Sequence, residues 1–179
     1  MTELWIPLKD IPAEGRDFTF TDQSLWTGPL REFGVGGTIG QAFSATMRIT
    51  PQGNGFLVSG NFTGSLLLPC VRCAESFELP LSGAFDGYEE LPPKQDRQAG
   101  PEELEEQGRL REVKGAPEFD AQGFLWEQFV LAMPENPLCA DDCKGLCPKC
   151  GVNRNKELCA CVEDKGDPRL AVLRNLKLH

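Results

Sequence analysis

Cysteine is the residue type with the most specific chemistry in this chain, because thiolates bind transition metals and take part in redox reactions. The chain has 179 residues and eight cysteines. Two fall in the segment PCVRCAES, and six fall in LCADDCKGLCPKCGVNRNKELCAC near the C-terminus. We interpret all eight as candidate metal ligands: Cys70, Cys73, Cys139, Cys143, Cys147, Cys150, Cys159 and Cys161.

The segment GLCPKCG carries the sharpest metal signal. Two intervening residues let a tight turn direct both sulfur atoms at one ion, and Gly151 permits the positive φ that such a turn commonly needs. A closed tetrahedral site takes four thiolates, so eight cysteines permit two sites. We favour one set made of Cys143, Cys147, Cys150 and either Cys159 or Cys161. Cys139 and the remaining tail cysteine would then join Cys70 and Cys73. Alternatively, the two C-x-x-C pairs share one site that ties the tail to a sheet.

The histidine count narrows the chemistry further. The only histidine is His179, the last residue, which argues against a Ser-His-Asp device and against a site of two cysteines and two histidines. We therefore favour structural zinc. Three alternatives stay open: disulfides, redox-active thiols of thioredoxin-like spacing without a βαβ context, and an iron–sulfur cluster without the ferredoxin C-x-x-C-x-x-C run.

Composition indicates an ordinary soluble globular protein, with 40% hydrophobic and 25% charged residues. No stretch approaches the roughly 20 apolar residues of a membrane-spanning helix. The N-terminal segment MTELWIPLKDIP has neither the basic leader nor the apolar region of a secretory signal. We expect a cytoplasmic protein with reduced thiols, no membrane partner and no small-molecule substrate.

Charge is divided unevenly along the chain, whose net charge is −9. Residues 1–138 hold 10 Lys and Arg against 21 Asp and Glu, a balance of −11, whereas residues 139–179 hold 8 against 6, a balance of +2. Because phosphate binding depends on Lys and Arg, the tail is the region best suited to contact RNA. The candidate contacts are Lys144, Lys149, Arg154 and Lys156, unless these are ordinary solvent-facing charges.

The pattern upstream of the tail predicts mostly strands. Short alternating segments at 4–11 and 17–22 and longer ones across 41–90 favour β-structure, with CVRC at the tip between two strands and with bulges or bends at Gly60 and Gly64. We expect about six antiparallel strands. Helices are predicted over 22–34, broken or delayed by Pro29, and from Asp120 to Pro134, where Phe124, Leu125, Phe129, Val130 and Met133 give one broad apolar face.

These elements predict an α+β fold that is mainly β. An antiparallel core, arranged as a meander or a partly closed barrel, would carry one packed amphipathic helix and a metal-stapled C-terminal tail. Residues 1–138 would form the core domain, with a mobile polar insertion at about 92–115 that includes a frayed helix around 102–110. Residues 139–179 would form the zinc-binding tail and end in a short helix from 167.

Two segments resemble one known family. The run DAQGFLWEQFVLAMPENPLCADDCKGLCPKCGVNRNKELCACVEDKGDPRLAVLRNL and the upstream LLLPCVRCAESFELPLSGAFDGYEE are similar to the YceD family, the large-ribosomal-RNA-subunit accumulation proteins. The resemblance implies a non-enzymatic factor that supports accumulation of large-subunit ribosomal RNA, in ribosome assembly. It brings no catalytic residues. The partner would be that RNA, or a basic ribosomal protein bound by the acidic body without RNA contact. A remaining alternative is that the chain itself is a thiol redox protein.

Overall fold

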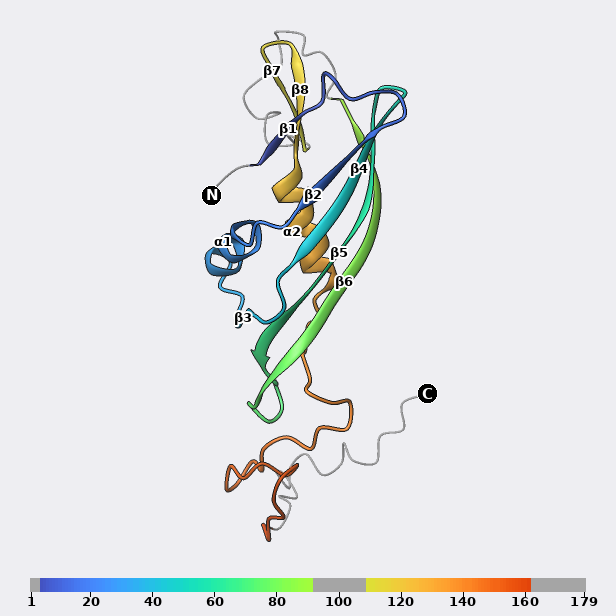
Figure 1. The fold of residues 1–179 in the computed structure, drawn as a ribbon. Coiled ribbons are helices and arrows are strands. Elements are labelled where there is room, and N and C mark those ends of the chain that lie inside the picture. The colour runs from blue at the N-terminus through green and yellow to red at the C-terminus, as the bar shows by residue number, and fades with distance from the viewer. Residues whose placement is uncertain (1–3, 92–108, 162–179) are drawn as a thin grey trace, which may run out of the picture.

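The longest elements of the computed structural model, which describes residues 4–91 and 109–161, are two strands that form one hairpin. Strands β5 (Gly55–Pro69) and β6 (Ser76–Glu90) pair along their whole length. On its other side β5 pairs first with β4 (Ser44–Gln52) and then with β3 (Thr38–Ile39), and β2 (Arg16–Phe20) pairs with β4. The hairpin therefore extends beyond the rest of this sheet, and its tip carries the CVRC turn (Figure 1).

A second, smaller sheet lies at the opposite end of the molecule from that tip (Figure 1). It consists of β1 (Trp5–Pro7), β8 (Ala116–Asp120) and β7 (Leu110–Val113), in the order β1-β8-β7. All strand pairs in both sheets are antiparallel. The fold is mainly β as predicted, but the large sheet is open: within the described residues, neither β2 nor β6 has a second partner that would close a barrel.

Two helices complete the described fold. Helix α2 (Ala121–Ala132) begins where predicted, because the Asp120 carboxylate accepts a hydrogen bond from the backbone amide of Gly123 at 2.9 Å. Helix α1 (Ser24–Glu32) continues through Pro29, where we expected a break. The Pro29 side chain is fully buried, so packing offsets the loss of a helical hydrogen bond.

The core gathers aromatic rings around Trp26. Its ring centroid lies 5.1 Å from that of Phe43, 6.1 Å from that of Phe62 and 5.9 Å from that of Phe129. These rings come from α1, the residue before β4, β5 and α2, so one cluster joins both helices to the large sheet. Aromatic contacts of this kind add to the stability gained by burial alone.

Gly60 and Gly64 of β5 allow close packing. The register of β5 with β6 runs without interruption through Gly60 and Gly64, and that with β4 runs through Gly60, so the predicted bulges are absent there. A Cβ on Gly64 would meet the Phe43 ring, and one on Gly60 would meet the backbone carbonyl of Thr46. Glycine is required here because neighbouring groups occupy the space of a side chain.

Three further expectations differ from the structure or lie outside it. The end of the predicted polar insertion, Leu110–Val113, is strand β7, because β8 pairs with it and β1 pairs with β8. Val130 does not join the buried face of α2 and is 45% exposed. The frayed helix around 102–110 falls almost wholly, and the terminal helix from 167 wholly, outside the described residues. The division into a core domain and a tail stays a prediction.

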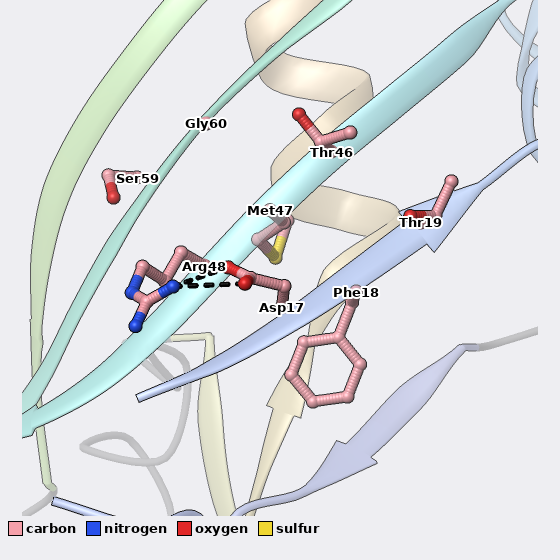
Figure 2. Close-up of a pocket in the computed structure, with 8 residues that line it drawn as sticks. All are labelled: Asp17, Phe18, Thr19, Thr46, Met47, Arg48, Ser59 and Gly60. Atoms are coloured by element: carbon pink, nitrogen blue, oxygen red, sulfur yellow. Dashed lines mark hydrogen bonds and ion pairs between the residues drawn. The ribbon is translucent and has the colours of Figure 1, made fainter. Parts of the chain in front are cut away.

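A shallow hollow of 230 Å³ lies on the face formed by β2, β4 and β5 (Figure 2). The two charged side chains in its lining, Asp17 and Arg48, form an ion pair with each other at 2.9 Å. The hollow therefore presents no unpaired charge to a ligand. Among the described residues, no helix combines the length and apolar character needed to cross a membrane.

Candidate metal centre

The eight cysteine sulfurs gather into two groups of four. Within each group the sulfur atoms all lie within 4.8 Å of one another. Site 1 consists of Cys70, Cys73, Cys139 and Cys143. Site 2 consists of Cys147, Cys150, Cys159 and Cys161. This grouping differs from the set we favoured, because Cys143 lies with the hairpin tip, and it differs from the alternative in which both C-x-x-C pairs share one site.

The turn at the hairpin tip directs the first two sulfurs of site 1. The backbone amide of Cys70 donates to the carbonyl of Glu75 at 2.9 Å, and the amide of Ala74 donates to the carbonyl of Cys70 at 2.9 Å. Ala74 adopts a positive φ of 56°, which closes the turn. Both Cys70 and Cys73 are buried, so the tip of β5 and β6 presents two fixed, shielded thiols.

The CPKC turn of site 2 has the same backbone design. The amide of Cys147 donates to the carbonyl of Val152 at 2.8 Å, and the amide of Gly151 donates to the carbonyl of Cys147 at 2.9 Å. Gly151 has a φ of 74°, as the sequence predicted. The two C-x-x-C turns are therefore equivalent, and each supplies half of one site.

The tail is held against the hairpin tip by backbone contacts as well as by its cysteines. The amide of Val71 donates to the carbonyl of Pro137 at 3.1 Å, and the amide of Leu146 donates to the carbonyl of Arg72 at 2.9 Å. The Arg72 guanidinium also donates to the carbonyl of Cys143 at 3.1 Å. These contacts explain why Cys143 belongs to site 1, since they align residues 137–146 with a turn about 70 residues earlier in the chain.

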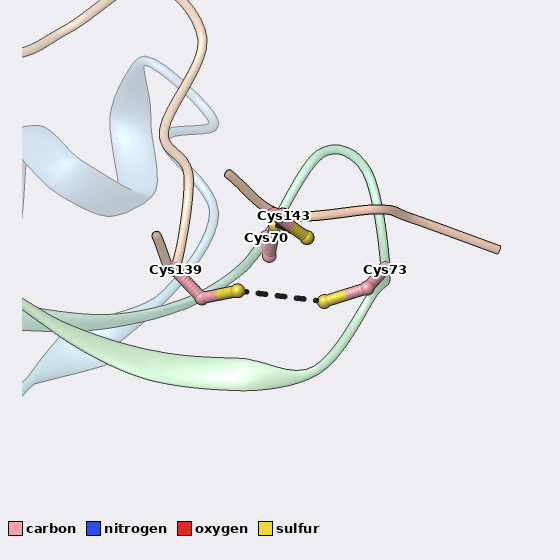
Figure 3. A group of neighbouring side chains, drawn as sticks. All are labelled: Cys70, Cys73, Cys139 and Cys143. Atoms are coloured by element: carbon pink, nitrogen blue, oxygen red, sulfur yellow. Dashed lines mark hydrogen bonds between the residues drawn. The ribbon is translucent and has the colours of Figure 1, made fainter. Parts of the chain in front are cut away.

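The sulfur separations in site 1 match those of a tetrahedral thiolate site. The Sγ atoms of Cys70 and Cys143 are 3.8 Å apart, and those of Cys73 and Cys139 are 3.7 Å apart (Figure 3). A disulfide would require about 2.05 Å. Four sulfurs at about 2.3 Å from a central zinc ion lie about 3.8 Å from each other. Each group of four cysteines could therefore hold a metal ion.

Thiolate formation in site 1 is favoured at one cysteine and opposed at another. Burial opposes ionisation of Cys70, but hydrogen bonds from the backbone amides of Cys139, Cys73 and Arg72 outweigh it and lower its pKa to about 6. Conversely, the hydrogen bond to the Cys143 sulfur, together with burial, raises the pKa of Cys139 to about 12. A bound cation would remove this opposition, because its positive charge favours all four thiolates.

Site 2 repeats this division of proton affinities. The backbone amides of Cys150 and Lys149 lower the pKa of Cys147 to about 6. The hydrogen bond to the Cys150 sulfur, together with burial, raises the pKa of Cys161 to about 12. Each site thus has at least one thiol whose pKa is lowered and one whose pKa is raised.

Asn155 is a site residue that sequence reasoning missed. It lies in the loop between Cys150 and Cys159, yet its side-chain amide donates to the Sγ atom of Cys143 in site 1 at 3.3 Å. Its side-chain oxygen accepts from the backbone amide of Lys144 at 2.8 Å. The sequence gives no signal for this role, because asparagine is common in turns and its partner is a ligand of the other site.

A second bridge joins the site 2 loop to the hairpin. Lys156 Nζ lies 2.7 Å from Glu75 Oε1, and the Asn153 side-chain amide donates to the same oxygen at 3.4 Å. The pKa of Glu75 is lowered, first by the hydrogen bond from Lys156 and then by the hydrogen bond from Asn153 and the charge of Lys156. The loop is therefore tied to the turn at the hairpin tip, just before β6 begins.

The four predicted RNA contacts fall into two classes. Lys144, Lys149 and Arg154 are exposed, and their side chains form no ion pair or hydrogen bond within residues 4–91 and 109–161. Lys156 is occupied by Glu75. The structure thus leaves three cationic side chains on the loops that carry sites 1 and 2.

Comparison with known proteins gives one match. The family model described as large ribosomal RNA subunit accumulation protein YceD matches residues 58–177, which include all eight cysteines. Neither a curated protein nor a solved structure matches the chain.

Proposed function

Because the chain belongs to the YceD family of large ribosomal RNA subunit accumulation proteins, we propose that it supports accumulation of that RNA by presenting a zinc-held basic surface. The role is non-enzymatic: the family description names accumulation of an RNA and no reaction. The observation that carries the proposal is the match itself. It covers both four-cysteine groups and the basic residues of the loops that carry them.

Zinc is the ion that suits these sites best. Both donor sets contain only cysteine, and structural zinc sites are commonly closed tetrahedra of four thiolates. Each site would use all four of its cysteines as ligands, which leaves no open position for a substrate. Zinc supplies folding energy in such sites and no chemical step.

The RNA contact is assigned to Lys144, Lys149 and Arg154. Their charges are not neutralised by partners among the described residues, so they are available to phosphate oxygens. The described tail beyond Cys139 contains no aromatic residue, so binding would be directed at the RNA backbone and weakened by salt. Lys156 contributes less, because its charge is shared with Glu75.

Filter binding to large-subunit RNA fragments tests this assignment. Replacing the three cations by glutamine (Lys144→Gln, Lys149→Gln, Arg154→Gln) should lower the salt dependence of affinity by about one unit per cation removed. A matched triple variant on the acidic body, Lys9→Gln, Arg31→Gln and Lys114→Gln, should leave it unchanged. Wild-type protein without measurable affinity even at low salt would overturn direct RNA contact.

A second candidate function is a scaffold for a basic ribosomal protein. Residues 1–138 have a charge balance of −11, and the exposed face of the edge strand β6 carries Glu78, Asp86 and Glu90. Such a surface would attract a basic partner. A partner that co-purifies with the protein after ribonuclease treatment would favour the scaffold, whereas a partner lost on that treatment would favour RNA contact.

Zinc quantitation with thiol titration separates both functions from redox chemistry. We expect two zinc ions per chain, with all eight thiols protected from alkylation. This expectation follows from the reducing cytoplasm that we assign to this protein. Zinc-free protein with reactive Cys70 and Cys147 thiols would instead favour a thiol redox role.

A further inference from the structure

We propose that site 1 and site 2 bind their metal ions cooperatively, with Asn155 as the residue that couples them. This inference rests on the proposed metal-binding function, and it concerns how the two sites act on each other. Asn155 belongs to the loop closed by site 2 but donates a hydrogen bond to a sulfur of site 1.

The orientation of the Asn155 side chain is fixed by its neighbours. The backbone amide of Lys144 is a donor, so the atom that receives its hydrogen bond at 2.8 Å must be the side-chain oxygen. The side-chain nitrogen then faces the Sγ atom of Cys143 at 3.3 Å and the side-chain oxygen of Asn153 at 2.9 Å. The sulfur of Cys143 therefore accepts a hydrogen bond from an N–H group of Asn155.

The position of this donor depends on the loop of site 2. Asn155 lies between Cys150 and Cys159, and both belong to site 2. A metal ion in site 2 would close this loop and so order it in advance. Metal binding at site 1 would then not carry the entropy cost of ordering the loop. Without that ion, the loop must be ordered before Asn155 can reach Cys143.

The donor matters to site 1 because it acts on a ligand directly. Groups that hydrogen-bond to metal ligands orient them and tune their charge, and their loss typically lowers metal affinity about 10- to 100-fold. The ion pair of Lys156 with Glu75 and the bond from Asn153 to Glu75 hold the same loop against the hairpin. Since coupling between binding sites is reciprocal, loss of site 1 must weaken site 2 by the same factor.

Chelator challenge of the full-length, zinc-loaded, reduced chain tests the coupling. Iodoacetamide labelling mapped by peptide mass spectrometry follows each site separately, through Cys70 and Cys73 for site 1 and through Cys147 and Cys150 for site 2. We expect Asn155→Ala to raise the labelling rate of site 1 about tenfold. Asn136→Ala is the matched control, because this exposed asparagine, just before the tail, has no side-chain hydrogen bond among the described residues.

A site 2 knock-out completes the cycle. The variant Cys147→Ser with Cys150→Ser should accelerate labelling of site 1 at least as much as Asn155→Ala does, and adding Asn155→Ala to it should have little further effect. Site 1 labelling that is unchanged in the knock-out, or equal in the Asn155 and Asn136 variants, would overturn the coupling and leave metal binding intact. Wild-type protein that takes up no zinc would overturn the metal sites and the coupling together.

Discussion

Lys156 Nζ lies 2.7 Å from Glu75 Oε1, which joins the loop of site 2 to a residue of the hairpin turn 81 positions earlier in the chain. The contact explains why the four basic residues of the tail are not equivalent. Three have no partner among the described residues, whereas this lysine has a structural one.

The first prediction concerns that difference. Lys156→Ala should weaken RNA binding less than Lys149→Ala, because the Lys156 charge is already neutralised by Glu75 in the free protein. Conversely, Lys156→Ala should accelerate proteolysis of the tail, and Lys149→Ala should not. Filter binding and limited trypsin digestion, read at common cleavage sites, measure the two effects. Equal losses of RNA affinity in both variants would contradict the distinction.

The second prediction contrasts two glycines with similar φ values. Gly145 and Gly151 have φ values of 69° and 74°. A Cβ on Gly145 would lie 2.9 Å from the Arg72 backbone carbonyl, whereas one on Gly151 would meet nothing within 4 Å. Gly151→Ala should cost about 1–2 kcal/mol for the left-handed backbone alone, and Ala74 already adopts this conformation in the equivalent turn. Gly145→Ala should cost more, because the tail must also move away from the hairpin.

Urea unfolding of the zinc-loaded protein checks the two glycine variants. A fluorescent probe introduced into the tail monitors the unfolding. If Gly151→Ala lowers the free energy of unfolding more than Gly145→Ala does, contact with Arg72 does not hold the tail.

The third prediction separates the two sites by what they connect. Cys70→Ser and Cys147→Ser should each lower the zinc content from two ions per chain to about one, provided that the coupling leaves the remaining site loaded at high zinc. Only Cys70→Ser should release the tail from the hairpin, because site 1 joins Cys73 to Cys139 across 66 residues, whereas site 2 is local. Native mass spectrometry counts the ions, and proteolysis within residues 133–138 reports the release. Release in the Cys147 variant at full site 1 occupancy would contradict this division.

The fourth prediction is a pH dependence of the metal-free, reduced protein. The pKa of Cys70 and of Cys147 is about 6, below the ordinary cysteine value of about 8.5. Because these folded-state values are lowered, the stability that they contribute is fully present above the unfolded pKa and is lost as the pH falls through about 6. Thiolate absorbance at 240 nm should therefore show a first step near pH 6. Cys139 and Cys161 should stay protonated up to about pH 12.

Serine variants assign that absorbance step. The step near pH 6 should be halved in either Cys70→Ser or Cys147→Ser. A single step near pH 8.5 for all eight thiols would show that the backbone amides do not reach these two sulfurs in the metal-free state.

Local patterns predicted most of the fold. The alternation in β4 to β6, the CVRC tip and the start of α2 at Asp120 depend on neighbouring residues, and each is found where the sequence indicated it. The grouping of ligands could not be predicted in this way. Cys143 joins site 1 because Leu146 and Arg72 share a hydrogen bond across the chain, and no local pattern encodes that contact.

Strand β7 shows the same limit upstream of the cysteine-rich segment. Its residues, Leu110–Val113, include two charged side chains and follow a polar segment, so the sequence indicated solvent exposure. They form a strand because β8 is already paired with β1, which lies about 100 residues away. Likewise, the sequence pattern predicts bulges or bends at Gly60 and Gly64, because the groups that occupy the side-chain space there lie elsewhere in the chain.

The long hairpin also sets an order of events during synthesis on the ribosome. Cys70 and Cys73 leave the exit tunnel 66 residues or more before Cys139 can join them. At a synthesis rate of about 5–20 residues per second, this gap lasts roughly 3 to 13 seconds. During that interval the nascent chain displays two thiols without the partners that complete site 1. Site 1 therefore stays incomplete until the segment that carries Cys139 and Cys143 has been synthesised.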